Sequence, residues 1–413
     1  MSNAAGSKLR LGVLVSHPIQ YFAPLFREMA VSPEIDLTVI YRTRVGVDAY
    51  YDPGFGETVH WDIPLLDGYR YEFLSRKNSL RGFEPKIVGV LLRNRFDVLL
   101  VHGYNSVTNL LATAVAKLLG TKLLLRGDTR LQPHHMAAST AKRRFKRWLL
   151  NVFDGCVAIG SLNKAYYHTF GVPVDRLYFA PFSVDNAAFS LGPEEAAGRR
   201  AEMRESLSIP DQAVVVLYAS KLTARKRPQD LLTAFGELSR EFPDAWLVMA
   251  GSGEEMPRLS ALACEHRLER VRFIGFQNQR TLPGLYAASD LFVLPSQDEP
   301  WGLVVNEAMA AGLPVIVADG VGAMSDLIQG QGTGAVYPCG DVEALVKVLS
   351  AFVGSENRRR QMSEKARSFI RDWDVNISAA ALIEAALAVA ARESVTARPV
   401  AAGKDTDSVG PDK

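Results

Sequence analysis

The stretch LFVLPSQDEPWGLVVNEAMAAGLPVIVAD, residues 291–319, holds two apolar runs separated by a run of good helix formers. Short continuous apolar runs predict strands that are buried on both faces, as in a parallel sheet. The segment 306–311 between them predicts a helix that ends at Gly312. A strand, a helix and a second strand in this order predict one parallel unit of an α/β fold.

Two carboxylates lie at the junction between the first strand and the helix. Glu299 falls on the loop, and Glu307 follows eight positions later in the first helical turns. Gly302 lets a ligand approach the backbone N–H groups of the helix start, whose partial positive charge favours anions. This arrangement predicts a site for a phosphorylated, hydroxyl-rich ligand. The alternative is that Glu299 lies on a loop without a role and that Glu307 only caps the helix.

Similar apolar runs occur along the chain in two sets. The first set predicts strands at 11–16, 35–41, 96–103, 122–127 and 154–160, and the second at 213–220, 245–253, 271–276, 290–296 and 314–319. We therefore predict an α/β fold with two Rossmann-like domains facing across a cleft, because parallel strands bind ligands at their carboxyl ends. The expected segments are a disordered leader at 1–8, a first domain at 9–185, a second domain at 186–365, a helical segment at 366–396 that packs back towards the first domain, and a disordered tail at 397–413.

The composition restricts the possible partners and compartment. The chain has 413 residues, 48% of them hydrophobic and 22% charged, and its net charge of +2 argues against nucleic acid as a partner. Three scattered cysteines, Cys156, Cys264 and Cys339, lack metal-ligand spacing and predict unpaired thiols in a reducing compartment. No run reaches the ~18 to 20 apolar residues that span a bilayer. We expect a cytoplasmic protein that can be peripheral on the inner face of the membrane.

A basic loop follows the first strand of the second set. Lys221, Arg225, Lys226 and Arg227 precede a predicted helix. Ammonium groups together with the amides of a helix start suit a diphosphate. The alternative is a basic loop that binds no ligand.

The segment 271–314 resembles the donor-binding half of a large glycosyltransferase family. It carries VRFIGF, LYAASDLFVLPS and EPWGLVVNEAMAAGLP in the family's order, and Glu299 and Glu307 match the family's E-x7-E motif. This family, the family-four or glycosyltransferase group 1 type, comprises retaining enzymes that use nucleotide sugars and have the GT-B fold. The resemblance implies that Glu307 binds the nucleotide ribose and that Glu299 holds the donor sugar.

The resemblance also assigns roles to neighbouring residues. The amides of Gly302, Leu303 and Val304 would hold the donor sugar, and Lys221 and Lys226 would neutralise the diphosphate, which makes Glu299, Lys226 and Lys221 the predicted catalytic residues. Ser220 and Arg227 stand where the family usually has glycine, but the charge of the loop is kept. The glycine loop with Gly251 and Gly253 would border the nucleotide, and the backbone at Phe276 and Gln277 would hold the base.

Polar side chains end three predicted strands of the first domain. They lie on one rim and suit the hydroxyls of a sugar, so we predict an acceptor site there. Its residues are His17, Gln20, Tyr21, His102, Arg126 and Asp128. Each group has a simpler reading: His17 as a satisfied core histidine, His102 as a turn residue, and Arg126 with Asp128 as a local ion pair.

The segment 141–150 holds five cations and two aromatic residues that would form an amphipathic helix. The composition is typical of a helix that rests on anionic lipid, although a solvated helix packed on the sheet would look similar. The predicted membrane residues are Lys142, Arg143, Arg144, Phe145, Lys146, Arg147 and Trp148.

The function predicted by the resemblance is a retaining transfer of sugar from a nucleotide diphosphate sugar. The expected acceptor is a glycan or lipid-linked saccharide in surface polysaccharide or glycoconjugate synthesis. No cofactor or metal is expected, because the two D-x-D spacings, 372–374 and 405–407, do not follow a strand at the cleft. The alternatives are a GT-B-like sugar-nucleotide epimerase and a non-catalytic subunit that binds sugar nucleotides and docks on membranes.

Overall fold

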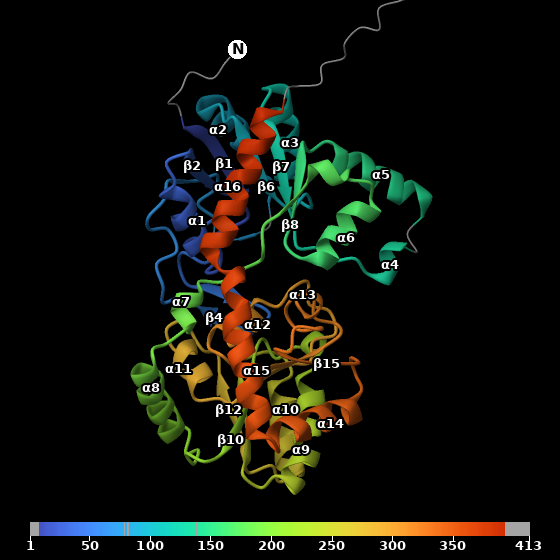
Figure 1. Cartoon of the computed structure of the whole chain (residues 1–413). Coiled ribbons are helices and arrows are strands. Elements are labelled where there is room, and N and C mark those ends of the chain that lie inside the picture. The colour runs from blue at the N-terminus through green and yellow to red at the C-terminus, as the bar shows by residue number, and fades with distance from the viewer. Residues whose placement is uncertain (1–7, 78, 81, 137–138, 393–413) are drawn as a thin grey trace, which may run out of the picture.

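The protein consists of two α/β domains stacked on each other, with the first above the second in Figure 1. The computed structural model describes residues 8–77, 79–80, 82–136 and 139–392. The leader predicted at 1–8, apart from Lys8, and the tail predicted at 397–413 lie outside the described residues.

The first domain contains a seven-stranded parallel sheet in the order β5-β2-β1-β6-β7-β8-β9. Its strands are β1 (Leu9–Val15), β2 (Ile35–Tyr41), β5 (Tyr71–Phe73), β6 (Val98–His102), β7 (Lys122–Arg126), β8 (Gly155–Ala158) and β9 (Leu177–Phe179). A separate antiparallel hairpin joins β3 (Tyr50–Asp52) and β4 (Glu57–Val59). The helices are α1 (Phe22–Ala30), α2 (Ile87–Asn94), α3 (Val107–Leu118), α4 (Pro133–Met136), α5 (Thr140–Asn151), α6 (Ser161–Thr169) and the 3-10 turn η1 (Val174–Arg176).

The second domain also contains a parallel sheet, with six strands in the order β12-β11-β10-β13-β14-β15. Its strands are β10 (Val214–Ala219), β11 (Ala245–Ala250), β12 (Val271–Gly275), β13 (Leu291–Leu294), β14 (Val315–Ala318) and β15 (Gly334–Tyr337). Its helices are α7 (Asn186–Phe189), α8 (Pro193–Ser206), η2 (Ala224–Lys226), α9 (Pro228–Glu241), α10 (Met256–Glu265), α11 (Leu282–Ala287), α12 (Leu303–Ala310), α13 (Met324–Leu327), α14 (Val342–Val353), α15 (Glu356–Phe369) and η3 (Ile370–Trp373).

The predicted α/β fold with two Rossmann-like domains is confirmed. Apolar cores lie on both faces of each sheet, which explains why its central strands read as continuous apolar runs. Sequence reasoning did not anticipate β3, β4, β5, β9 and β15. These strands are short, and β5 and β9 carry exposed or half-buried side chains that break the apolar pattern.

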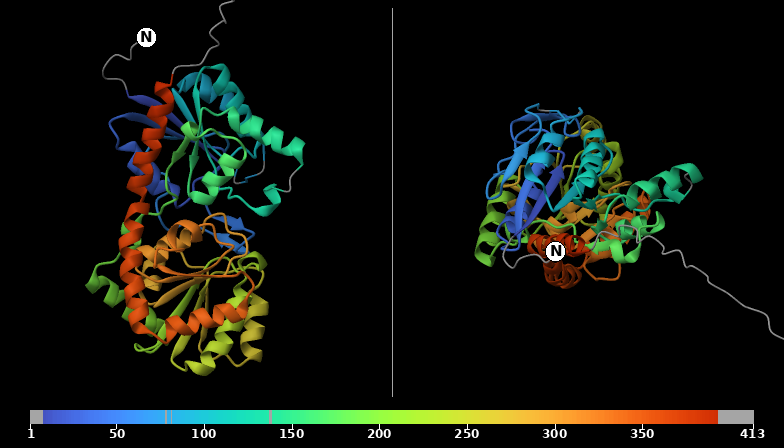
Figure 2. Two further views of the ribbon diagram at one scale, coloured as in Figure 1. Left: turned by 45° about the vertical axis from the view of Figure 1, so that its right-hand side comes forward. Right: turned by 90° about the horizontal axis from the view of Figure 1, so that it is seen from above.

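The last helix, α16 (Val375–Ala391), crosses back to the first domain. Figure 2 shows α15 and α16 running along the same side of both domains. Leu382 and Ala386 of α16 are buried in the core of the first domain beside β1 and β2. Asp374 begins this helix by accepting a hydrogen bond from the Val375 amide, and it also accepts one from the Asn186 amide at 3.2 Å. One of the two D-x-D spacings therefore contributes a helix cap.

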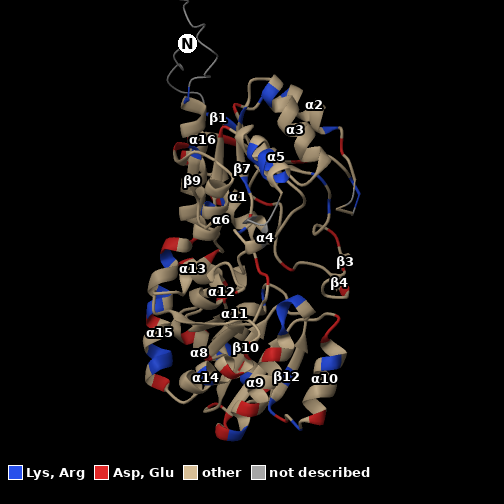
Figure 3. Cartoon of the chain, turned by 90° about the vertical axis from the view of Figure 1, so that its right-hand side faces the viewer, with Lys and Arg blue, Asp and Glu red and all other residues tan. Residues whose placement is uncertain are grey.

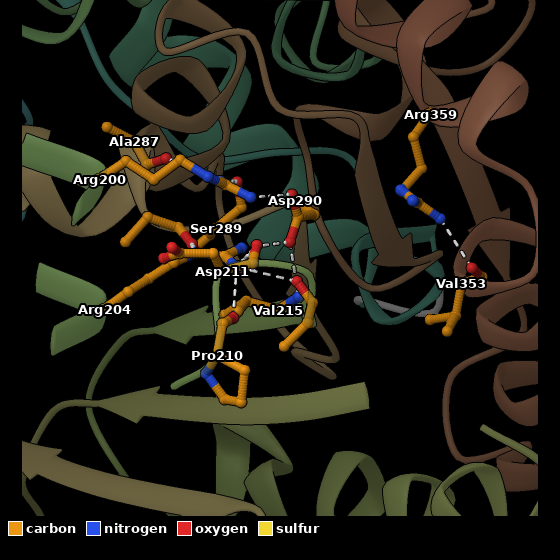
Figure 4. Close-up of polar contacts among 12 residues, drawn as sticks. Arg200, Arg204, Pro210, Asp211, Val215, Ala287, Ser289, Asp290, Val353 and Arg359 are labelled. Carbon is orange, nitrogen blue, oxygen red and sulfur yellow. Dashed lines mark hydrogen bonds and ion pairs between the residues drawn. The ribbon is translucent and has the colours of Figure 1, made fainter. Parts of the chain in front are cut away.

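A buried arginine attaches α8 to the second sheet. The Arg204 guanidinium is fully buried and donates to Asp290 Oδ2 at 2.8 Å (Figure 4). It also donates to the Ala288 carbonyl oxygen at 2.9 Å. Its Nη1 donates to the carbonyl oxygens of Pro210, Asp211 and Ala213. Because the charge is paired and its donors are occupied, the cost of burying it is offset.

Candidate functional site

A cavity of about 450 Å³ lies between the domains, at the carboxyl ends of both sheets. It is lined by most of the residues predicted from the sequence. The predicted residues that line it are His17, Gln20, Tyr21, Asp128, Lys221, Lys226, Gly251, Phe276, Gln277, Glu299, Gly302, Leu303, Val304 and Glu307. The two halves of the predicted site, donor and acceptor, therefore face one another across a single cavity.

The first glutamate of the E-x7-E pair contacts the basic loop. Lys226 Nζ forms an ion pair with Glu299 Oε2, and both side chains are largely buried. Because carboxylate and ammonium neutralise each other in the free protein, an anionic ligand that takes Lys226 leaves Glu299 free to accept hydrogen bonds. The loop is held further by Arg225 Nη1, which donates to the Asp298 carbonyl oxygen at 2.6 Å.

The second glutamate is fully buried at the cavity wall. Tyr286 donates to Glu307 Oε2 at 2.6 Å, whereas Oε1 has no hydrogen-bond partner among the described residues. Burial raises the pKa of Glu307 to about 7, and the hydroxyls of Tyr286 and Tyr21 act in the opposite direction. An unpartnered buried carboxylate oxygen costs free energy, so this oxygen is positioned to accept a hydrogen bond from a ligand hydroxyl.

The start of α12 offers backbone N–H groups to the cavity. Gly302 precedes the helix with a left-handed φ of 96°, and a side chain there would approach Glu299 and Leu294 to 3.2 Å. Gly302, Leu303 and Val304 all line the cavity. The amides of a first helical turn have no partner within the helix, so they are available to an anion or a polar oxygen.

Trp301 fixes the loop that carries these groups. Its ring nitrogen donates to Asn306 Oδ1 at 2.9 Å, and Asn306 donates to the Phe182 carbonyl oxygen at 3.0 Å. The indole also stacks on Trp373 with ring centroids 5.2 Å apart. The sequence reasoning missed Trp301, although its place inside the E-x7-E motif was a signal.

The glycines of the 250–254 loop serve the close approach of two backbones. A Cβ atom on Gly251 would lie 1.9 Å from the Ser220 carbonyl oxygen, and one on Gly253 would lie 2.3 Å from the Leu222 carbonyl oxygen. Their φ angles, 138° and 153°, are in the region that favours glycine. Gly251 lines the cavity, and Gly253 is not among the described residues that do so. The loop thus fixes the basic loop that carries Lys221.

Phe276 and Gln277 lie at the end of β12. The Phe276 amide donates to Ser252 Oγ at 3.0 Å, and the Gln277 side chain donates to the Ile274 carbonyl oxygen at 2.7 Å. The Phe276 ring meets Phe55 and Trp61 of the first domain edge to face, at centroid distances of 4.8 and 5.9 Å. An aromatic cluster from both domains therefore lies beside the strand end predicted to hold the base.

The predicted acceptor residues divide into two groups. His17, Gln20, Tyr21 and Asp128 line the cavity, and His102 and Arg126 are not among the described residues that do. His102 packs edge to face on Phe22 at 5.0 Å. The Arg126 guanidinium is buried over the ring of Phe182, which itself lines the cavity. These two side chains therefore support the wall of the cavity from behind.

Burial shifts the pKa values of three ionisable side chains among the predicted acceptor residues of the first domain. Burial and the neighbouring Arg42 lower the pKa of His17 to about 4, so its imidazole is neutral at pH 7, and its Nδ1 lies 2.8 Å from Ser16 Oγ. Burial, and in second place Arg126, lower the pKa of His102 to about 3. Burial and the negative charge of Glu299 raise the pKa of Asp128. Arg126 and Asp128 have no ion pair with each other among the described contacts.

Several cavity residues from the first domain were not anticipated. Tyr50, Asp52, Phe55 and Trp61 come from the hairpin and the loop that follows it. Asp52 accepts hydrogen bonds from Lys221 Nζ at 2.8 and 2.9 Å, across the two domains. No sequence motif links positions 52 and 221. The only signal in the sequence was the mixture of acidic and aromatic residues in the segment 50–61.

Other contacts join the domains at the rim of the cavity. Arg130 and Gln132 both donate to Asp298 Oδ1, at 3.2 and 2.5 Å. Ser161 donates through its amide and hydroxyl to Asp326. These contacts join loops and helices of the first domain to loops and helices of the second.

The basic helix α5 leaves its aromatic residues and most of its cations exposed. Leu149 and Leu150 are buried against the body, whereas Phe145 and Trp148 are 63% and 62% exposed, with ring centroids 5.7 Å apart. Lys146 lies over the rings of Tyr166 and Phe170. The helix projects from the first domain (Figure 2), and its cations are prominent in Figure 3. Among the described residues, no helix has the length and apolar character needed to cross a membrane.

The described residues contain no group of three His, Cys, Asp or Glu side chains that could hold a metal ion. The three cysteines are free: Cys156 is buried, Cys264 is exposed and Cys339 is half-buried.

The protein has two domains, each with a parallel sheet, on either side of one cavity. This architecture, with the E-x7-E pair and two lysines in the cavity wall, defines a protein of the GT-B class. Solved structures agree with this class: Anabaena HepE in complex with UDP and glucose has a TM-score of 0.69 and 18% identity, covering 91% of this chain and 98% of that one. The family model described as "Glycosyl transferases group 1" matches residues 199–369. The match lies within the second domain, which therefore resembles this family.

Among curated proteins, the chain is similar to two D-inositol 3-phosphate glycosyltransferases. The protein of Xylanimonas cellulosilytica is 30% identical over 221 residues, which are 52% of each chain. The protein of Saccharomonospora viridis is 28% identical over 394 residues, covering 91% of this chain and 80% of that one. The chain spans about half the length of the Xylanimonas relative.

Proposed function

We propose that the protein is a retaining glycosyltransferase that transfers a sugar from a nucleoside diphosphate sugar to a hydroxyl group of a glycan or lipid-linked saccharide. The observation that carries the proposal is the convergence of Glu299, Glu307, Lys221 and Lys226 on one cavity. The UDP and UDP-glucose complexes among the structural neighbours are consistent with such a donor. We place the reaction in surface polysaccharide or glycoconjugate synthesis.

In this proposal the second domain binds the donor. The unpartnered Glu307 Oε1 accepts a hydrogen bond from the ribose, and the two lysines take the diphosphate. Glu299, released from Lys226, and the amides at the start of α12 hold the hydroxyls of the transferred sugar. Trp301 and Phe182 add apolar surface to the cavity wall beside these polar groups.

The proposed reaction breaks the bond between the anomeric carbon and the diphosphate oxygen. The acceptor hydroxyl attacks the anomeric carbon on the face that the diphosphate leaves, and its proton passes to a leaving diphosphate oxygen. Negative charge grows on the diphosphate in the transition state, so prepositioned cations contribute most, at about 3 kcal/mol for each group. Since Lys221 and Lys226 supply that neutralisation, we propose that no divalent metal is required. Full activity in excess chelator is the expected result, and activity that returns only when manganese or magnesium is added would contradict it.

The test is a reaction of the protein with a panel of nucleoside diphosphate sugars and saccharide acceptors, followed by NMR of the products. We expect release of the nucleoside diphosphate and a new glycosidic bond with the anomeric configuration of the donor. An inverted configuration would contradict the retaining mechanism. Conversion of the donor without an acceptor would favour the epimerase, and binding without turnover would favour the non-catalytic subunit.

We also propose that α5 docks the protein on the inner, cytoplasmic face of an anionic membrane. Lys142, Arg143 and Arg144 are exposed together with the Phe145 and Trp148 rings. Basic residues near an anionic surface each contribute about 1 kcal/mol at low screening, and exposed aromatic rings enter the headgroup region. Docking would bring the cavity close to a lipid-linked acceptor.

Co-sedimentation with anionic and neutral vesicles tests the docking proposal. Arg143→Glu/Arg144→Glu should lower pelleting with anionic vesicles several-fold, and 0.5 M salt should do the same for the unaltered protein. Arg358→Glu/Arg360→Glu on α15 of the second domain is the matched control and should pellet normally. Equal pelleting of both double variants, or no preference for anionic lipid, would overturn the proposal.

A further inference from the structure

The turn between β3 and β4 of the first domain encloses the ammonium group of Lys221 from the second domain. Lys221 Nζ lies 2.8 and 2.9 Å from the two carboxylate oxygens of Asp52 and 4.6 Å from the centre of the Phe55 ring. A Cβ atom on Gly54 would lie 2.9 Å from the same nitrogen, so a larger residue at that position would push the lysine side chain aside. The hairpin thus surrounds this cation on three sides with an acid, a glycine and an aromatic ring.

Asp52 is built to be charged in this position. Its Oδ1 also accepts hydrogen bonds from the amides of Gly54 and Phe55, at 2.8 and 3.2 Å. Burial acts to raise the pKa of the Asp52 carboxyl, but Lys221 and these amides lower it, and the net direction is downwards. The Asp52 side chain is 13% exposed and the Lys221 side chain is 36% exposed, so the ion pair is partly shielded from solvent.

The segment that follows the hairpin contacts the strand end beside the predicted base site. Asn278 donates to the His60 carbonyl oxygen at 2.6 Å, and the Arg280 amide donates to the carboxylate of Asp62. Phe55 and Trp61 meet Phe276 there. Both ends of a bound nucleoside diphosphate, base and phosphates, would therefore meet the same first-domain element.

We infer that the β3–β4 hairpin is part of the donor site and that Asp52 occupies, in the free protein, the place on Lys221 that the donor diphosphate takes on binding. The inference rests on the proposed function. A diphosphate carries more negative charge than one carboxylate and has additional amide partners at α12, so it displaces Asp52. Displacement releases the hairpin from Lys221 and makes every ligand that uses Lys221 compete with an internal anion. A nucleoside without phosphates does not displace Asp52.

Calorimetric titration of the full chain with UDP, GDP and ADP tests this inference. Asp52→Asn keeps the shape of the side chain but removes the competing charge, so the tightest-binding diphosphate should bind about fivefold more tightly, as expected for a partly exposed ion pair. Asp36→Asn is the matched control, because it removes an equal charge from an exposed ion pair with Arg70 in the same domain. This control should leave the dissociation constant unchanged.

A double-mutant cycle separates competition from a general structural effect. In a Lys221→Met background, Asp52→Asn should give no gain in affinity, because the carboxylate no longer competes for a cation. Equal or weaker binding by Asp52→Asn, or the same gain with and without Lys221, would overturn the inference and leave the proposed function standing. Failure of the unaltered, folded protein to bind any of the three diphosphates would overturn both.

Discussion

The two halves of the cavity are built in different ways. In the second domain, Glu299, Gly302 and Glu307 lie within nine consecutive residues, and one loop and one helix position them. In the first domain, Asp52, Tyr21 and Asp128 come from separate elements and meet the cavity only because the whole sheet is assembled. The comparison shows that a site made by one strand-to-helix unit can be recognised in a sequence, whereas one made by distant elements depends on tertiary packing.

The largest expected effect is the loss of catalysis when Lys226, in the second-domain half of the cavity, loses its charge. Lys226→Ala should lower the turnover number and kcat/KM by about 10² to 10³, because the lost charge faces the leaving diphosphate in the transition state. Lys347→Ala on the outer helix α14 is the control and should behave as the unaltered protein. Steady-state kinetics measures both, and an unchanged kcat/KM for Lys226→Ala would contradict the assignment.

The next effect is the pH dependence of stability that the buried carboxyl of Glu307 causes. Folding raises the pKa of Glu307 from 4.5 to about 7, so the folded state binds the proton more tightly than the unfolded state. Stability should therefore fall as the pH rises from about 4.5 to about 7 and be level above it, a loss on the order of 3 kcal/mol. Glu307→Gln should remove this dependence.

Chemical unfolding between pH 5 and pH 8 measures the effect of Glu307. Glu307→Gln should gain stability relative to the unaltered protein as the pH rises. Parallel stability curves for the two proteins would show that Glu307 does not change protonation on folding.

A third, intermediate effect tests the contact between the glycine loop and the basic loop. Gly251→Ala should destabilise the protein by about 2 to 3 kcal/mol, because the added methyl meets the Ser220 carbonyl oxygen and the backbone is left-handed. Gly198→Ala, inside α8 with open space around it, should instead stabilise by about 0.5 to 1 kcal/mol. Thermal unfolding decides the signs, and equal behaviour of the two variants would contradict the close approach.

The smallest effect is expected at the rim, where the two domains meet. Asp298→Ala removes an acceptor for Arg130 and Gln132, but its side chain is half exposed, so the loss of stability should stay below about 1 kcal/mol. A loss of more than 2 kcal/mol in urea unfolding would mean that the domains depend on this contact more than its exposure implies.

The sequence predicted the fold class and ten of the strands because these strands form short, mainly apolar runs, and nine of the ten lie inside a sheet. The sequence also predicted that Glu299, Glu307, Lys221 and Lys226 share one site, because each follows a strand at the same edge of a sheet. It could not place Asp52, whose partner lies 169 positions away. His102 and Arg126 end strands as expected, but packing against Phe22 and Phe182 turns their side chains behind the cavity wall. Strand ends alone do not give the direction of a side chain.

The central claim is that the E-x7-E pair and the two lysines bind a nucleoside diphosphate. The most direct measurement is a crystal structure of the protein grown with whichever of UDP, GDP and ADP binds most tightly. We expect ribose hydroxyls on Glu307, phosphates on Lys221 and Lys226, and Glu299 separated from Lys226. A nucleotide bound outside this cavity, or bound with Lys226 still paired to Glu299 and Glu307 free of the ribose, would contradict it.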